Sequence, residues 1–276
     1  MEKNAQPDPD RISRLQKTSW RHIWSISWPI FLANITVPLV GAVDTAMMGR
    51  FPDPAYIGGV ALGTLVFSFL YFGLGFLRMC TTGLVAQAHG RNDEAEIENL
   101  LIRGLIIALT LGSVAILASP IIHLVTSQLL AASSSVEVQM RTYVEIRLFA
   151  APAALGNMVL LGCLFGRQQM RLCMVQIMVV NICNLLLNIL FVVGFGMKID
   201  GIALASVAAQ WLGFVFTLSL IGWQWRDMLR GVMARLFTRK PSWFDLSAFG
   251  QFFSLGVDLI LRTLMLLACE AIFLNN

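Results

Sequence analysis

A single acidic residue stands out in the first apolar stretch of the chain. Asp44 lies in the run NITVPLVGAVDTAMMGR, in which no other side chain before Arg50 is charged. An unpaired carboxylate buried in hydrocarbon costs at least a few kcal/mol, so such a residue usually faces a cavity or a partner. Asp44 is therefore the first candidate for an ion-coupling site. The alternative is a place near the outer headgroups, where Asp44 pairs with Arg50.

A polar stripe in a later apolar stretch is the second candidate. The segment NICNLLLN places Asn181, Asn184 and Asn188 three and four residues apart, which puts them on one face of a helix. In a membrane helix such amides coordinate an ion, bind a substrate or join helices. Asn157 and Ser206, from two other apolar stretches, are compatible with the same inward surface.

Two further residues could move or line such a site. Pro29 removes a backbone donor and favours a bend, for which a static kink is the simpler interpretation. Glu270, in the last apolar stretch, is a second buried carboxylate and a candidate for the substrate pocket. The sequence contains no nucleophile elbow, no HExxH and no phosphate-binding glycine loop. We therefore expect neither an enzyme nor a metal or cofactor.

The elements that position these residues are membrane-spanning helices. Apolar residues make up 57% of the chain and charged residues only 13%. A bilayer core of about 30 Å needs roughly 20 apolar residues per helix, and such stretches recur along the chain. The basic residues are dispersed between them, so a nucleic-acid surface is not expected. The composition predicts an all-α, multi-pass membrane protein in contact with lipid.

The hydropathy pattern predicts six complete spans and the start of a seventh. The chain then divides into an amino-terminal segment (1–22), a transmembrane lobe (23–223), an amphipathic connector (224–246) and the start of a second lobe (247–276). Because the last stretch is still apolar at Asn276, we expect an incomplete chain. The six spans are expected at residues 23–49, 57–88, 101–122, 143–165, 172–195 and 202–223, and the seventh begins near 249.

The distribution of basic residues predicts the orientation. Successive loops of a multi-pass protein lie on alternate sides of the membrane. With the loops assigned in this way, most of the 20 Lys and Arg residues lie on the same side as the amino terminus. Retained loops favour the cytoplasm, so the amino terminus is expected there. The opposite side is assigned only Arg50, Arg141, Arg147 and Lys198.

Three segments resemble a known transporter family. WPIFLANITVPLVGAVDTAMMGR, GLVAQAHGRNDEAEIENLLIRG and NICNLLLNILFVVGFGMKIDGIALASVAAQW follow one another in the chain. They resemble successive signatures of the multidrug and toxic compound extrusion (MATE) family, in particular its DinF-like branch. The resemblance implies a twelve-helix antiporter of the bacterial inner membrane, built from two six-helix lobes. It would export amphiphilic, often cationic compounds in exchange for protons or sodium ions, and a missing carboxy-terminal lobe would be this chain's partner.

The resemblance also implies roles for individual residues. Asp44 matches the aspartate of the first span that is the family's proposed proton or sodium site, and Pro29 matches the proline whose bending accompanies protonation. Asn184 matches an asparagine of the same polar cluster. The DinF-like branch usually has an aspartate where this chain has Asn188. One carboxylate fewer weakens a sodium site, so we expect protons rather than sodium.

Two further positions match less closely. Ser206 stands near a position that is often threonine in the family, and Asn157 resembles an asparagine that lines the pocket. Two alternatives stay open for the function. One is a lipid-linked precursor flippase of the related superfamily, which would need a more cationic cavity. The other is a truncated remnant that does not transport.

Overall fold

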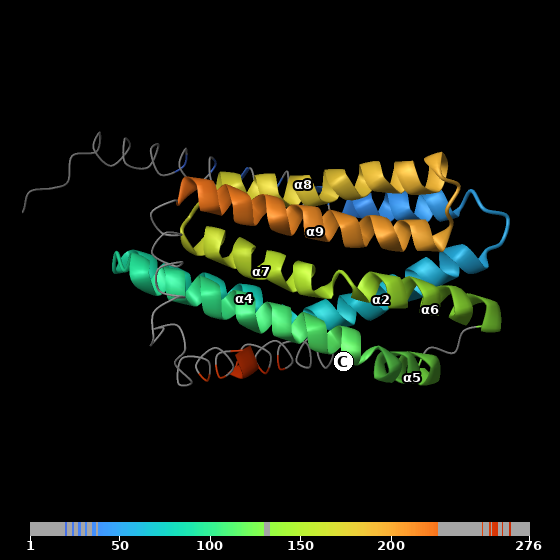
Figure 1. The fold of residues 1–276 in the computed structure, drawn as a ribbon, viewed down its shortest axis with the longest axis horizontal. Coiled ribbons are helices and arrows are strands. Elements are labelled where there is room, and N and C mark those ends of the chain that lie inside the picture. Colours follow the sequence, from blue (N-terminus) through green and yellow to red (C-terminus); the bar gives the residue numbers. More distant parts are fainter. Residues whose placement is uncertain are drawn as a thin grey trace, which may run out of the picture.

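The computed structural model describes residues 38–129 and 133–225, and isolated positions between residues 20 and 36 and between 250 and 265. Regular structure in these residues is helical (Figure 1). The helices lie roughly along one common axis, as membrane helices do. In chain order they are Pro38–Met48, α2 (Ala55–Leu74), α3 (Phe76–Gly90), α4 (Glu94–Leu117), α5 (Ser119–Leu129), α6 (Ser134–Leu148), α7 (Ala151–Gly166), α8 (Met170–Asn188), η1 (Ile189–Gly194) and α9 (Ile199–Gln224).

Several of these helices are long and apolar enough to cross a membrane. Four do so as continuous units, and α6 with α7 forms a fifth if the bent pair is one span. The first expected span is described as a helix only from Pro38 onward. These findings confirm the predicted all-helical membrane fold. The four units are Ala55–Gly90, Glu94–Leu117, Met170–Gly194 and Ile199–Gln224.

The predicted fourth span, 143–165, is bent in the structure. The chain instead forms α6 and α7, which meet at a bend of 56°. Pro152 lies in the first turn of α7, where its missing N–H is not needed by the helix. The break between Leu148 and Ala151 follows from this placement of the proline.

The predicted third span, 101–122, is also misplaced at both ends. Helix α4 ends at Leu117, and α5 begins separately at Ser119. At the other end, Asp93 caps α4 by accepting a hydrogen bond from the Glu96 amide at 3.0 Å. Arg103 then pairs with Glu96 at 3.2 Å, so the helix includes an acidic residue that the hydropathy pattern had placed before the span.

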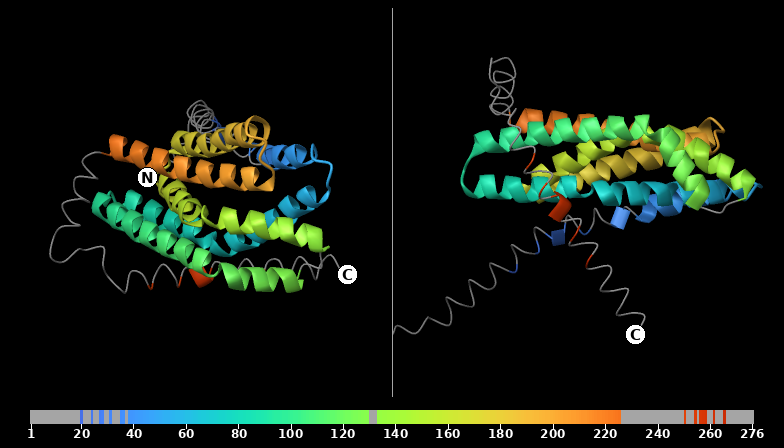
Figure 2. Two further views of the ribbon diagram at one scale, coloured as in Figure 1. Left: turned by 45° about the vertical axis from the view of Figure 1, so that its right-hand side comes forward. Right: turned by 90° about the horizontal axis from the view of Figure 1, so that it is seen from below.

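Helix α7 is the centre of the packing. It contacts α3, α4 and α9, while α2 packs on α6 and α8 on α9. Figures 1 and 2 show α8 and α9 on one side of α7 and α4 on the other. Glycines allow close approach: a Cβ at Gly162 would lie 2.8 Å from the carbonyl oxygen of Arg78. Small residues at such contacts are typical of membrane helices, which associate by close packing.

The outer faces of the helices are apolar and exposed. Large side chains such as Phe69, Leu117 and Trp223 present most of their surface to the surroundings. Such a surface fits contact with lipid chains. The connector expected at 224–246 lies outside the described residues beyond Trp225, as does most of the expected second lobe, so the division into four segments stays a prediction.

Candidate ion and substrate site

Asp44 lies in the last turns of the Pro38–Met48 helix and is only 7% exposed. Its Oδ1 accepts a hydrogen bond from Nδ2 of Asn188 on α8 at 2.6 Å. This bond is shorter than most N–H···O hydrogen bonds. Among the described residues, Asp44 forms no ion pair with Arg50. The acid is thus held against a neighbouring helix.

A ladder of hydrogen bonds continues from Asp44 across three helices. Asn188 also donates to Oδ1 of Asn184 at 3.1 Å, and Asn184 donates to Oγ of Ser206 on α9 at 3.2 Å. All four side chains are buried. We call Asp44, Asn188, Asn184 and Ser206 the polar ladder. The structure brings together the four residues that the sequence singled out for ion coupling, and that role stays a prediction.

Asn188 occupies a special place in its helix. It is the last residue of α8, and the π-helix η1 begins at Ile189. Short π-helical turns often occur at functional sites. The Oδ1 atom of Asn188 is buried and has no hydrogen-bond partner among the described residues. The polar ladder therefore contains an unused acceptor beside the acid.

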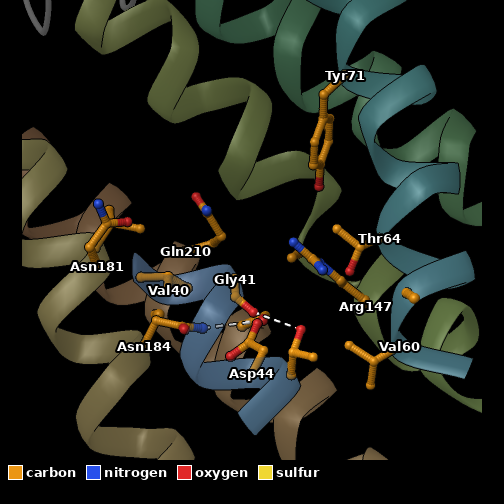
Figure 3. A pocket seen from close by; sticks show the side chains of 16 residues that line it. Val40, Gly41, Asp44, Val60, Thr64, Tyr71, Arg147, Asn181, Asn184 and Gln210 are labelled. Carbon is orange, nitrogen blue, oxygen red and sulfur yellow. Dashed lines mark hydrogen bonds between the residues drawn. The ribbon is translucent and has the colours of Figure 1, made fainter. Parts of the chain in front are cut away.

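A cavity of about 480 Å³ opens beside the ladder. Its size falls in the range of about 300–1,000 Å³ that is typical of ligand sites. Figure 3 shows side chains from several helices directed into this space. Its polar lining includes Asp44, Thr64, Tyr71, Arg147, Asn181 and Gln210, with apolar neighbours such as Val40 and Val60.

Arg147 is the cation of this cavity. It extends from the last turn of α6 and is half-buried. Its guanidinium lies over the rings of Phe67, 4.9 Å from the centroid, and Tyr143, at 5.2 Å, and Nη1 donates to Oη of Tyr143. The sequence had assigned Arg147 only to the side opposite the amino terminus. The overlooked signal is Tyr143, four residues earlier and therefore on the same helix face.

Asn157 borders a neighbouring cavity of about 310 Å³. Its Nδ2 donates to the backbone oxygen and to Oε1 of Gln210, both at 2.9 Å, and Gln176 donates to the Asn157 carbonyl at 3.0 Å. The two cavities share Tyr71, Asn181 and Gln210 in their lining. Asn157 is therefore adjacent to the first cavity but not part of its wall. Gln176 and Gln210 were not singled out from the sequence.

Three other residues were singled out from the sequence: Asn181, Pro29 and Glu270. Asn181 donates to Oγ1 of Thr36 and lines both cavities, on the side of α8 that the polar stripe predicted. Pro29 and Glu270 lie outside the described residues. Their expected roles stay predictions.

Comparison with known proteins decides the family. The MatE family model matches residues 29–191 of the chain. This chain belongs to the MatE family. It is 38% identical over 255 residues to the DNA damage-inducible protein F of Escherichia coli, covering 91% of this chain and 54% of that protein. The resemblance to the DinF-like branch of MATE transporters is confirmed.

Other MatE relatives are more distant. A probable multidrug resistance protein NorM of Synechococcus is 27% identical over 218 residues, which are 73% of this chain and 46% of that protein. The chain spans about half the length of the curated relatives it matches.

Solved MatE structures share the fold. One is the outward-facing conformation of a multidrug resistance MATE family transporter, with a TM-score of 0.67 at 20% identity over 84% of this chain and 49% of that one. A transporter of the MOP superfamily from Pyrococcus furiosus, described as having a binding pocket of reverse polarity, reaches 0.66 at 20% identity. That match covers 74% of this chain and 44% of the other. The MatE fold is thus a multi-pass helical membrane fold of transporters.

Proposed function

We propose that this chain forms the amino-terminal lobe of an ion-coupled antiporter that exports amphiphilic organic compounds across the bacterial cytoplasmic membrane. The observation that carries the proposal is the buried Asp44, bonded to Asn188 at the wall of a cavity of about 480 Å³. The relatives described as multidrug resistance proteins support the same class of substrate. In this proposal the amino terminus is cytoplasmic.

The polar ladder gives the two charge states of Asp44 different hydrogen-bond needs. The ionised carboxylate only accepts, and Asn188 supplies a donor at 2.6 Å. A protonated carboxyl group gains an O–H donor, and Oδ1 of Asn188 is an acceptor without a partner among the described residues. Protonation therefore favours a different arrangement of Asn188. Because Asn188 belongs to α8, this change acts on how α8 packs against the Pro38–Met48 helix.

Protons are the coupling ion that we favour over sodium. A second carboxylate beside Asp44 would strengthen the attraction for a sodium ion. The ladder offers one carboxylate, two amide oxygens and a hydroxyl, because an asparagine stands at position 188. Proton exchange needs only Asp44. In proteoliposomes of the full-length gene product, efflux driven by a proton gradient in sodium-free buffer supports this choice, whereas efflux that requires a sodium gradient contradicts it.

Transport requires the full-length gene product, because alternating access normally uses two repeats that rock around a central site. The test of the proposal is Asp44→Asn in that protein, assayed for ion-driven efflux of a fluorescent cationic dye from proteoliposomes. We expect efflux to be lost while the variant keeps the circular dichroism spectrum of the wild type. Asp53→Asn is the matched control, because Asp53 is exposed and its side chain accepts a bond from the Ala55 amide that asparagine can also accept. Undiminished efflux by Asp44→Asn refutes the role of Asp44.

A further inference from the structure

The cavity beside the polar ladder carries charges of both signs. Asp44 lines it from the Pro38–Met48 helix and Arg147 from α6. In Figure 3 the Arg147 guanidinium is directed into the same space as Asp44, with Gln210 and Tyr71 nearby. The two groups attract one another but do not form an ion pair. An occupant of this cavity therefore meets a positive and a negative site at different points.

The guanidinium of Arg147 packs against two aromatic side chains. Its Cζ atom lies over the rings of Phe67 and Tyr143, both of which are almost fully buried. One nitrogen donates to the Tyr143 hydroxyl, which lies 3.5 Å from Oγ1 of Thr64. A guanidinium has five N–H donors, so the bond to Tyr143 leaves others for further partners.

In the described part of the chain, no acidic side chain forms an ion pair with Arg147. Among the described residues, three other arginines pair with glutamates, whereas Arg147 has no ion pair. Asp44 directs Oδ1 to Asn188 instead. A guanidinium presents five donors in a planar fork that matches the two oxygens of a carboxylate. The paired arginines are Arg103 with Glu96, Arg141 with Glu145 and Arg167 with Glu94.

We propose that Arg147 binds a carboxylate of the exported compound, so that the cavity selects zwitterionic amphiphiles. The acid of such a compound pairs with the guanidinium edge, and its cationic group lies toward Asp44. Thr64, Tyr71 and Gln210 line the same cavity and supply neutral hydrogen-bonding groups. This inference rests on the proposed export function and adds to it a class of substrate and the residue that selects it.

The test uses two dyes that differ only in whether their carboxyl group is free or esterified. Rhodamine B is a zwitterion with a free carboxylate, and its ethyl ester is a cation with the same ring system. Binding of each dye to the full-length gene product in lipid nanodiscs is measured by fluorescence anisotropy. The wild type is expected to bind both. Arg147→Gln is expected to weaken rhodamine B binding by at least about tenfold, the size of a lost charge-assisted hydrogen bond, and to leave ester binding within about threefold.

Two further variants separate the charge from its position. Arg147→Lys keeps the charge but loses the planar fork, so we expect an intermediate loss of rhodamine B binding. Arg141→Gln removes an exposed arginine on the same helix and is expected to leave the binding of both dyes unchanged. Retained ester binding shows that each variant is folded.

Three results overturn the inference. The first is an equal loss of binding affinity for both dyes in Arg147→Gln, and the second is unchanged rhodamine B binding in that variant. The third is a wild type that fails to bind rhodamine B. None of them affects the export proposal, which depends on the efflux of Asp44→Asn. Conversely, intact efflux in Asp44→Asn refutes the coupling role of Asp44 and leaves the dye selectivity of Arg147 to be judged by binding.

Discussion

Removing Asn188 should cost the folded protein a measurable interaction with Asp44. The perturbation is a double-mutant cycle of Asp44→Ala, Asn188→Ala and the double variant. The Asn188 donor is 2.6 Å from Oδ1 of Asp44, and both side chains are buried. Hydrogen bonds between membrane helices average about 0.6 kcal/mol in such cycles and reach about 1.7 kcal/mol.

The coupling of Asp44 with Asn188 belongs in the upper part of that range. A bond to an ionised group is roughly twice as strong as a neutral one, so we expect a coupling free energy of about 1.2 kcal/mol. The control cycle uses Asn184 and Ser206, which form a neutral bond at 3.2 Å in the same ladder. Its coupling should be close to the average of about 0.6 kcal/mol.

The assay is reversible unfolding of the full-length gene product in mixed micelles with increasing SDS, followed by circular dichroism. The coupling is the part of the double variant's loss of unfolding free energy that the two single variants do not account for. A value for Asp44 with Asn188 no larger than that for Asn184 with Ser206 would refute the reasoning. The two residues would then be neighbours without a charge-assisted bond.

Two other predictions concern packing and pH. Gly63→Ala should lower the free energy of unfolding by about 1–3 kcal/mol, because the added Cβ overlaps the Tyr143 ring. The same SDS titration checks this, with Gly73→Ala, which meets open space, as a control that should not destabilise. A hydrogen bond to Tyr56 raises the pKa of the exposed Lys198 above its usual 10.5. The contact therefore stabilises the folded protein fully below pH 10.5, and this stabilisation is lost as the pH rises through the raised pKa of Lys198. Tyr56→Phe should therefore speed labelling of Lys198 by an amine-reactive ester at alkaline pH, and an unchanged rate would contradict the contact.

The polar ladder could be predicted because its signals are local. Asn184 and Asn188 are four residues apart, and a buried acid such as Asp44 needs a partner in an apolar environment. The fold class followed from apolar stretches of sufficient length. These features depend on composition and on the helix period, both of which the sequence displays directly.

The rest of the site depends on tertiary packing. Arg147 follows the charged residues Arg141 and Glu145 near the start of an expected span, and only the packing of α6 against α2 and α9 places its side chain in the cavity. The hydrogen bonds of Asn157 with Gln176 and Gln210 join α7, α8 and α9. No spacing rule connects residues so far apart in the chain. The bend at Pro152 had a local signal, but its angle follows from the helices around it.

The break between α6 and α7 has an electrical consequence for the buried cation. A helix carries a partial negative charge of about half an elementary charge at its carboxyl end, from carbonyl groups that the helix itself does not satisfy. Arg147 lies in the last turn of α6, where this negative pole acts on its guanidinium. In one continuous helix through residues 134–166 that pole would be a full helix length away. The bend thus places a negative pole beside this cation, in addition to the attraction of Asp44 in the same cavity.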